Sequence, residues 1–393
     1  ARIALHEGTF RKYHPELKLN DGDRFLKIAV EACRKIMDTK HYSLSTSKES
    51  GLPAYQSLFC SADLTQNPEM ILVADYDKAL GRLHNAQAQF DYNTGLSRSL
   101  MEDYLVVEDG QTKYFHEVEG YRTKTVLEIF ENRDPRLEQT FMKPGVLNVG
   151  TTEPHRAKLN LGGYPQIKFR PLTFDQMDWG KSYTDLPIIR YAEILLIYAE
   201  AKAELGTLTQ DDINNTINLI RQRAGMPDAS LDDWLANIDP VQEERYSNVQ
   251  SSQKGAVLEV RRERRIELAC EGFRYGDLMR WGCGKLFEAA PEGAYIPGMG
   301  YYDVTGDGTP DIAVVEKKAD VDKIPEEDKQ KYKLTVYALE GNTIGLTEGT
   351  KGHIYLIAQH GKYTFVSPKY YYYPVATKDI TVNENLYQNP FWE

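Results

Sequence analysis

The chain contains 393 residues, enough for one large core or two domains, and carries a formal net charge of −11. This negative charge argues against nucleic acid or an anionic membrane surface as the main partner. The 26 Tyr residues favour a binding protein, because each ring offers a flat apolar face and a polar tip. Neither a signal peptide nor a transmembrane span is recognisable, and the four cysteines show no metal-ligand spacing.

Two helices, over residues 2–14 and 24–38, are predicted to form a hairpin at the start of the chain. The small residues Gly8 and Ala29 would allow a close approach of the kind found in tetratricopeptide repeats. Ala1 leads directly into the first helix without a capping residue, so we expect further sequence upstream, including any targeting signal.

Regular helix patterns fade between residues 43 and 182. We predict a short strand at 70–74, a short helix after residue 95 and a longer helix over 121–130. A region of this length is not typical of a linker, so it is predicted to fold over the helices and to carry function.

Helices return at residues 187–205 and 210–224, with Pro187 in the first turn of the former. Glu193 and Glu200 lie among apolar residues of the first of these helices. They are predicted to pair with arginines elsewhere, although a catalytic carboxylate pair is the alternative.

Residues 257–281 are predicted to form one long charged helix. Glutamates recur every four residues and so share one face, at Glu259, Glu263, Glu267 and Glu271. We expect an arginine–glutamate network that locks helices together, in which Arg261, Arg264 or Arg265 pairs with Glu193 and Glu200. The alternative is a metal or acid–base site, but a di-iron bundle would need Glu-x-x-His pairs, and this helix contains no His.

Residues 286–366 are again irregular, with short strands predicted within 334–341 and 352–359. An Asp- and Gly-rich loop in this region is a candidate calcium site, because calcium binds clustered oxygen atoms. Its ligands would be Asp303, Asp307, Asp311 and a backbone carbonyl near Thr309. The full EF-hand pattern is absent, and a metal-free Asp–Gly turn is the alternative.

Three stretches, at 186–206, 261–282 and 370–392, together resemble the SusD/RagB family of surface glycan-binding lipoproteins from Bacteroidetes. The segments NRDPRL (132–137) and GGYPQIKF (162–169) also look like that family. The five stretches follow the family's order, and the resemblance extends over nearly the whole chain.

The resemblance implies a mainly α fold, built of tetratricopeptide-like helix pairs with a large irregular half that contains short strands. It implies one unit over residues 1–393 that lacks the family's N-terminal part and its lipidated cysteine. The helical repeats would be 1–42, 183–226 and 255–284, and the irregular segments on the ligand side would be 43–182 and 285–393.

The resemblance further implies a non-catalytic protein, lipid-anchored at the outer face of the outer membrane, that delivers oligosaccharide to a SusC-like TonB-dependent transporter. No cofactor would be required, with calcium at the Asp-rich loop as the optional ion. Two alternatives stay open: a peptide-binding uptake protein of the same fold, and a glycoside hydrolase with two carboxylates flanking a cleft.

Sugar rings stack on aromatic side chains, and their hydroxyl groups form hydrogen bonds with polar ones. The candidate ligand-binding residues are therefore loop aromatics and two polar neighbours of Tyr92: Phe90, Tyr92, Asn93, Arg98, Tyr114, Tyr121, Tyr164 and Trp179. Trp234 and Trp281 are flanked by helix and are assigned to the core.

Overall fold

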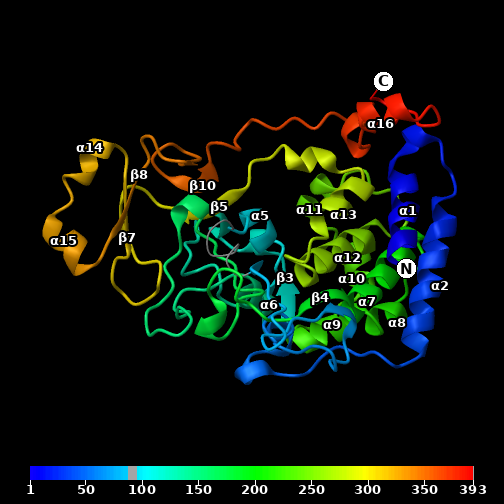
Figure 1. Ribbon diagram of the computed structural model, residues 1–393, viewed down its shortest axis with the longest axis horizontal. Helices are drawn as coiled ribbons and strands as arrows, with labels where there is room; N and C mark the ends of the chain where they lie inside the picture. Colours follow the sequence, from blue (N-terminus) through cyan, green and yellow to red (C-terminus); the bar gives the residue numbers. More distant parts are fainter. Residues whose placement is uncertain (87–94, 393) are drawn as a thin grey trace.

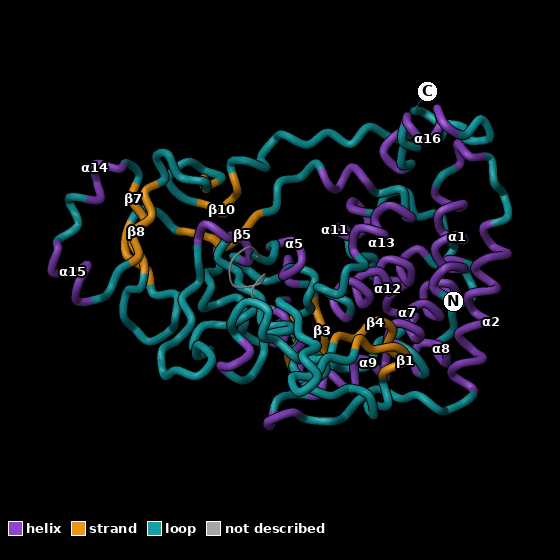
Figure 2. The backbone as a smooth tube through the Cα atoms, in the orientation of Figure 1, coloured by secondary structure: helices purple, strands orange, loops and turns teal. Residues whose placement is uncertain are grey.

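The computed structural model describes residues 1–86 and 95–392. Helices gather at one end of the molecule, and an irregular half with small sheets extends from them (Figure 1). Figure 2 shows that loops make up most of this irregular half. The mainly helical architecture with short strands confirms the predicted fold class. No helix of the described residues is long and apolar enough to span a bilayer.

The helical half consists of α1 (Arg2–Tyr13), α2 (Gly22–Asp38), α7 (Tyr191–Glu204), α8 (Gln210–Asn214), α9 (Ile217–Ala224), α10 (Leu231–Ala236), α11 (Pro240–Arg245), α12 (Lys254–Glu267) and α13 (Arg274–Arg280). Shorter helices elsewhere are α3 (Ala54–Ser57), α5 (Arg98–Met101), α6 (Arg136–Thr140), α14 (Lys318–Val321), α15 (Glu326–Lys331) and α16 (Thr377–Val382).

The strands form small separate sheets. Two are antiparallel pairs: β1 (Met70–Ala74) with β4 (Leu186–Arg190), and β2 (Val106–Glu108) with β3 (Gln111–Lys113). An antiparallel three-stranded sheet has the order β5 (Glu292–Ile296), β10 (Gly352–Leu356), β9 (Ile344–Leu346). In the other, β7 (Ile312–Val315) pairs antiparallel with β6 (Gly300–Tyr302) and parallel with β8 (Thr335–Ala338).

The hairpin of α1 and α2 is confirmed, and glycine explains its close packing. A Cβ atom on Gly8 would lie 2.8 Å from the Leu26 side chain, and one on Gly22 would lie 2.7 Å from the Gly8 carbonyl oxygen. Leu26 and Ala29 are fully buried between α2 and its neighbours. Small residues therefore set the distance between the first two helices, as the sequence predicts.

The helix predicted over 187–205 begins only at Tyr191, because the preceding residues form strand β4. Pro187 pairs with Val73 of β1, and Arg190 has an extended backbone. The strand predicted at 70–74 is confirmed as β1 and supplies the partner. Pairing with a distant strand thus displaces the start of the helix.

The charged helix predicted over 257–281 is wrong as a single element, since α12 ends at Glu267 and α13 starts at Arg274. Cys270 and Gly272 have positive φ values of 64° and 83° in the break. Buried side chains donate to carbonyl oxygens at and just after the end of α12: Arg190 Nη2 to the Glu267 oxygen at 2.8 Å, and Lys168 Nζ to the Ala269 oxygen at 2.7 Å. These donors satisfy carbonyl oxygens that a further helical turn would otherwise have bonded, and so stabilise the end of α12.

Two other predicted helices are also shorter in the structure. The helix over 210–224 is divided into α8 and α9, because Thr216 leaves the helical conformation and its hydroxyl donates to the Asp212 carbonyl. The helix over 121–130 is reduced to one turn of 3₁₀ helix at Tyr121–Thr123, after which Lys124 is extended.

Two large hydrophobic clusters form most of the interior of the described residues, beside two smaller ones. The larger surrounds α7 and α12 and includes Trp234 and Trp281, which confirms the prediction that both belong to the core. The second fills the irregular half and includes the strands β5, β7, β9 and β10. Ile266, near the end of α12, belongs to the second cluster, so this helix contacts both interiors.

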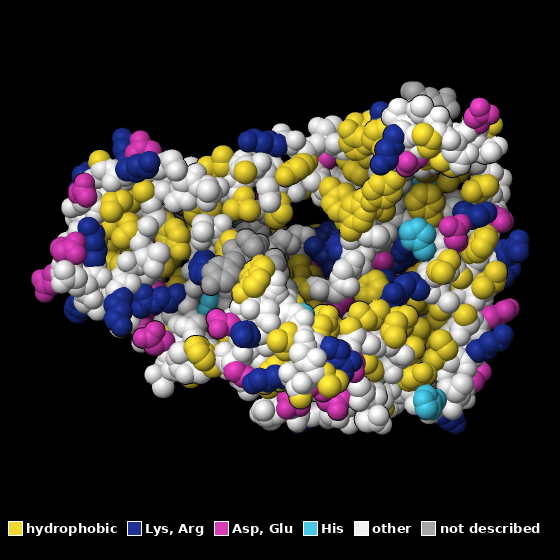
Figure 3. Space-filling view, viewed as in Figure 1, with side chains coloured by type: hydrophobic (Ala, Val, Ile, Leu, Met, Phe, Trp, Pro, Cys, Tyr) yellow, Lys and Arg dark blue, Asp and Glu magenta, His cyan; other side chains and the backbone are white. Residues whose placement is uncertain are grey.

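Residues 357–392, which we name the C-terminal arm, return from β10 to the helical half along one edge of the molecule (Figure 1). Tyr371 Oη accepts a hydrogen bond from the Gly284 amide, and its ring lies against His14 at the end of α1. The space-filling view shows a hollow between this arm and the body of the molecule (Figure 3). The arm therefore connects the sheet that contains β10 to the end of α1.

Candidate functional site

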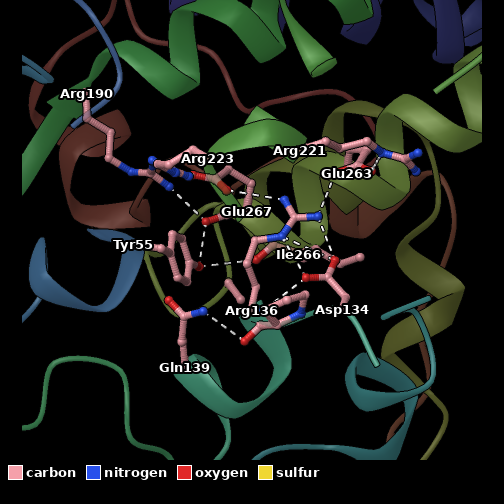
Figure 4. A network of polar contacts seen from close by, with 12 residues as sticks. Tyr55, Asp134, Arg136, Gln139, Arg190, Arg221, Arg223, Glu263, Ile266 and Glu267 are labelled. Carbon is pink, nitrogen blue, oxygen red and sulfur yellow. Dashed lines mark hydrogen bonds and ion pairs between the residues drawn. The ribbon is translucent and has the colours of Figure 1, made fainter. Parts of the chain in front are cut away.

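The glutamate face of α12 lies at the centre of a buried polar network, in which side chains from α3, α6, β4, α9 and α12 converge (Figure 4). Arg136 lies 3.0 Å from Glu263 and 3.3 Å from Glu267. Arg190 contacts Glu267 at 2.6 Å. Each of these side chains is at most 2% exposed. The network therefore joins the irregular half to the helical half away from solvent.

Protonation in this network is fixed by the arginines. Burial alone would raise the pKa of Glu267, but Arg223, Arg190 and Arg136 outweigh it, so that the pKa lies well below its usual range. The pKa of Glu263 is also lowered against burial, mainly by Arg221 and Arg136. Both carboxylates stay ionised and fully paired, as in a structural ion network rather than a catalytic acid–base pair.

The prediction that the charged helix pairs with α7 is confirmed for Glu200 and wrong for Glu193. Arg261 contacts Glu204 at 3.0 Å, and Arg264 lies 3.8 Å from Glu200. Glu193 instead pairs with Arg2 of α1 at 2.6 Å. The assignment of Glu193 was wrong because its position on α7 faces α1.

Arg265 and Glu200 have other partners. Arg265 pairs with Asp103, in the loop after α5. Glu200 accepts hydrogen bonds from Arg280, the last residue of α13, and from the indole nitrogen of Trp281, which follows it. Glu200 is therefore saturated by donors and is not left free as one half of a catalytic pair.

The Asp-rich loop holds its carboxylates with its own backbone. Asp303 accepts hydrogen bonds from the amides of Gly306 and Gly308, and Asp311 from those of Val304 and Thr305. The Asp307 carboxylate accepts from the amide and hydroxyl of Thr309. Among residues 1–86 and 95–392, no group of three His, Cys, Asp or Glu side chains is arranged to hold a metal ion. The loop geometry gives the calcium prediction no support.

A solvent-facing apolar surface lies on two adjacent loops, residues 75–86 and 173–184, which we name the Trp179 surface. Trp179, Phe174 and Leu80 are 66%, 70% and 67% exposed. Exposed aromatic rings on loops are candidates for contact with a ligand. The sequence singled out Trp179 but missed Phe174 and Leu80, although Phe174 lies in the same aromatic, turn-rich stretch.

Several polar contacts fix the two loops of this surface to each other. His84 and Ser182 form a backbone bridge, and the Gly180 amide donates to the Asn85 side chain. Lys78 pairs with Asp175 at 2.7 Å, and this hydrogen bond lowers the pKa of Asp175 to about 2. The exposed apolar side chains thus stand on a pre-formed scaffold.

The Trp179 surface is anchored to the body by the buried carboxylate of Asp185. One oxygen accepts from the Tyr76 amide and the other from the Leu64 amide. Burial raises the pKa of Asp185 despite these two hydrogen bonds. Asp185 is fully buried and directly precedes β4, so the loops continue into a regular element.

A model of the SusD family matches residues 69–392. The chain belongs to the SusD family. A curated relative, the SusD-like protein P38 of Formosa agariphila, is 23% identical over 272 residues, which cover 64% of this chain and 48% of the relative. The chain thus spans about half the length of that relative.

Solved structures show the same fold. A SusD-like carbohydrate binding protein from Bacteroides fragilis has a TM-score of 0.59 at 22% identity, with 93% of this chain and 63% of that chain covered. A second SusD-like protein from the same organism has a TM-score of 0.59 at 17% identity, with 100% and 63% covered. At these identities the likeness concerns the fold alone.

Two other predicted ligand residues of this SusD-family chain lie in the interior. Arg98 is 2% exposed and donates to Glu102, to His353 and to the carbonyl oxygens of Tyr121 and Arg122. Tyr164 is 3% exposed in the second core cluster. Because both are enclosed, the structure does not bring them to the Trp179 surface.

The remaining candidates are at the surface or outside the described residues. Tyr114 and Tyr121 are half-buried, with Arg262 over the Tyr114 ring and Arg98 beside Tyr121. Tyr114 also lines a small cavity of about 280 Å³ next to Trp234. Phe90, Tyr92 and Asn93 lie outside the described residues.

Proposed function

We propose that this SusD-family protein binds oligosaccharide at the cell surface, leaves it chemically unchanged, and delivers it to a SusC-like TonB-dependent transporter. The observation that carries the proposal is the exposure of Trp179 and Phe174 on fixed loops of a SusD-family chain. The fold neighbour from Bacteroides fragilis is described as carbohydrate binding, which supports glycan as the ligand class. Attachment to the outer membrane through an N-terminal lipid belongs to the same proposal.

The chemistry of the Trp179 surface suits a sugar. Flat C–H faces of a pyranose stack on indole and phenyl rings, and Asn85 and Asp175 lie on the same loops as hydrogen-bonding groups. Contacts of this kind depend little on charge, so affinity is expected to change little with salt. The sequence-based candidates Phe90, Tyr92 and Asn93 remain part of the proposed set of ligand-binding residues.

The saturated carboxylates favour binding over hydrolysis. A glycosidase needs one carboxyl group that is protonated and faces substrate. Glu263 and Glu267 are buried and held ionised by arginines, and Glu200 is saturated by Arg280 and Trp281. The glutamates that looked most suited to catalysis thus have a structural explanation.

The test is calorimetry of the full-length protein against a panel of soluble oligosaccharides, followed by chromatography of each glycan. We expect saturable binding and an unaltered glycan. Trp179→Ala should weaken binding by about 1–2 kcal/mol, roughly tenfold, because stacking area is lost. The fold should persist, because the ring is exposed.

Tyr387→Ala is the matched control, since it removes another exposed aromatic ring, 83% exposed, on the C-terminal arm. It should leave glycan affinity unchanged. Cleaved glycan would replace the proposal with the hydrolase alternative. Flat titrations with every glycan together with tight binding of peptides would favour the peptide-uptake alternative.

A further inference from the structure

A second cavity, of about 430 Å³, lies where α1 meets β4 and the break between α12 and α13. Its volume is within the range of small-molecule sites. No lining residue belongs to the Trp179 surface, so the two sites are separate. Apolar residues form one part of its wall and three arginines another: Leu5, Ile197, Phe273, Arg2, Arg264 and Arg280.

Phe273 holds two of these cations against the wall. The guanidinium carbon of Arg2 lies 5.1 Å from the centre of the Phe273 ring, and that of Arg264 lies 5.2 Å from it. Cations within about 6 Å of an aromatic ring are attracted by its negative face. The ring therefore keeps two guanidinium groups beside one cavity.

The carboxylates that line the cavity are already saturated. Glu271 accepts two hydrogen bonds from Arg190 and one from Lys168, each at 2.7 Å. Asp277 accepts from Arg264 at 2.9 Å and from Arg280 at 3.0 Å. These acidic groups have little remaining capacity to accept hydrogen bonds from a ligand.

Arg264 has donor capacity left. Its side chain is 4% exposed, and its Nε donates to Asp277, but its Nη1 has no hydrogen-bond partner among the described residues. A buried donor without an acceptor is unfavourable, and more so when it is charged. A ligand that brings an oxygen atom to this group would remove that cost.

We propose that this cavity binds a small carboxylate with an apolar body. The carboxylate oxygens meet Nη1 of Arg264 and Nη1 of Arg2, because charge-assisted hydrogen bonds are the strong ones. Nε and Nη2 of Arg2 already donate to Glu193 and to the Ile188 carbonyl oxygen. The apolar body lies against Leu5 and Ile197. The site works independently of the glycan at the Trp179 surface.

Gly276 offers a clean way to close the cavity. It lines the cavity within α13, and a Cβ atom built on it would have no neighbour within 4 Å. Gly276→Leu therefore fills the space with an added side chain while leaving the arginines in place. Gly298→Leu is the matched control, because a Cβ atom there also meets nothing within 4 Å and Gly298 lies outside the cavity.

The experiment titrates the full chain with sodium benzoate by calorimetry and NMR, at an ionic strength held constant with chloride. We expect saturable binding that shifts the imidazole signals of His6, which lines the cavity, and leaves those of His353 unmoved. Gly276→Leu should weaken binding at least tenfold. Arg264→Lys should do the same, because it keeps the positive charge but loses the planar guanidinium group that can donate two parallel hydrogen bonds. Gly298→Leu should bind as wild type.

Parallel titrations with inorganic sulfate and phosphate distinguish the ligand class. Tight binding of either ion without binding of benzoate would overturn the proposal, because the apolar wall would then have no role. A response to benzoate equal to that of chloride, or one that Gly276→Leu leaves unchanged, would also overturn it.

Discussion

Among single residues, Glu267 shows how this protein keeps charge in its interior. Three guanidinium groups, from Arg136, Arg190 and Arg223, contact one carboxylate that has no exposed surface. Taking such charges out of water costs several kcal/mol per ion, and only mutual pairing offsets that cost. Removal of one member therefore leaves the others buried without a partner.

Glu267→Gln tests whether the charge of this carboxylate stabilises the fold. The amide keeps the size of the side chain but removes its charge, so we expect a loss of about 3–5 kcal/mol in the free energy of unfolding. Chemical denaturation monitored by circular dichroism measures it. Glu348→Gln is the control, because its pair with Lys351 is more than half exposed and should contribute at most about 1 kcal/mol. Equal stability of both variants would contradict the structural role of the network.

Among the elements, the C-terminal arm depends on one close approach. A Cβ atom on Gly284 would lie 2.2 Å from the Phe365 ring, which also lies near the Tyr371 ring, with centroids 4.7 Å apart. The backbone of Gly284 is compatible with other residues, because its φ is not positive. Space for the aromatic ring, rather than backbone freedom, therefore requires glycine at this position.

Gly284→Ala should displace Phe365 and loosen the arm. Overpacking of this kind costs about 1–3 kcal/mol. We expect a lower melting temperature and faster proteolytic cleavage within residues 357–370 than in wild type. Gly298→Ala, where a Cβ atom has free space, is the control. A Gly284→Ala protein as stable and as resistant as wild type would argue against the contact.

The sequence predicts an element well where its own residues determine the secondary structure. It predicts less well where contact with a distant segment determines it. The strand at 70–74 and the hairpin of α1 and α2 follow from their own residues. Residues 186–190 suit helix and strand alike, and only β1, more than a hundred residues away, selects the strand. The break after Glu267 depends on Lys168, a donor that no local pattern reveals.

The same limit applies to the candidate ligand surface. Trp179 lies between Asp and Gly in a turn-rich stretch, and such a local pattern predicts an exposed side chain. The structure confirms that Trp179 is exposed. Arg98 has an equally polar setting in the sequence but is buried, because His353 lies 255 positions away and accepts its hydrogen bond. Burial of a loop residue depends on such long-range contacts.

Across the whole molecule, stability is expected to depend on pH through histidines that are neutral when folded. Burial first, and then Arg98 and Arg122, lower the pKa of His353 to about 4. Burial also lowers the pKa of His6 and of His84. The unfolded chain binds protons at these sites near pH 6.5, whereas the folded chain binds them only at lower pH.

We therefore expect the melting temperature to be nearly constant between pH 7 and 8 and to fall as pH decreases from about 6.5 to 4. His353→Gln should reduce this slope, because an amide oxygen can accept from Arg98 without titrating. Its share is on the order of 2 kcal/mol, reduced for partial solvent contact. Calorimetric melting at several pH values measures the slope. A variant whose slope equals that of wild type would show that His353 does not contribute.

The buried network also has a consequence for kinetics. It includes residues that are far apart in the sequence: Glu69, Arg136, Arg190, Arg223 and Glu267. A partial set would hold charges in the interior without compensation, so we expect these contacts to form only after the segments have come together. Interactions absent from the folding transition state slow unfolding and leave the folding rate nearly unchanged. We therefore expect the network to lengthen the lifetime of the folded protein, which would matter at the proposed cell-surface location, where proteases act on transiently opened chains.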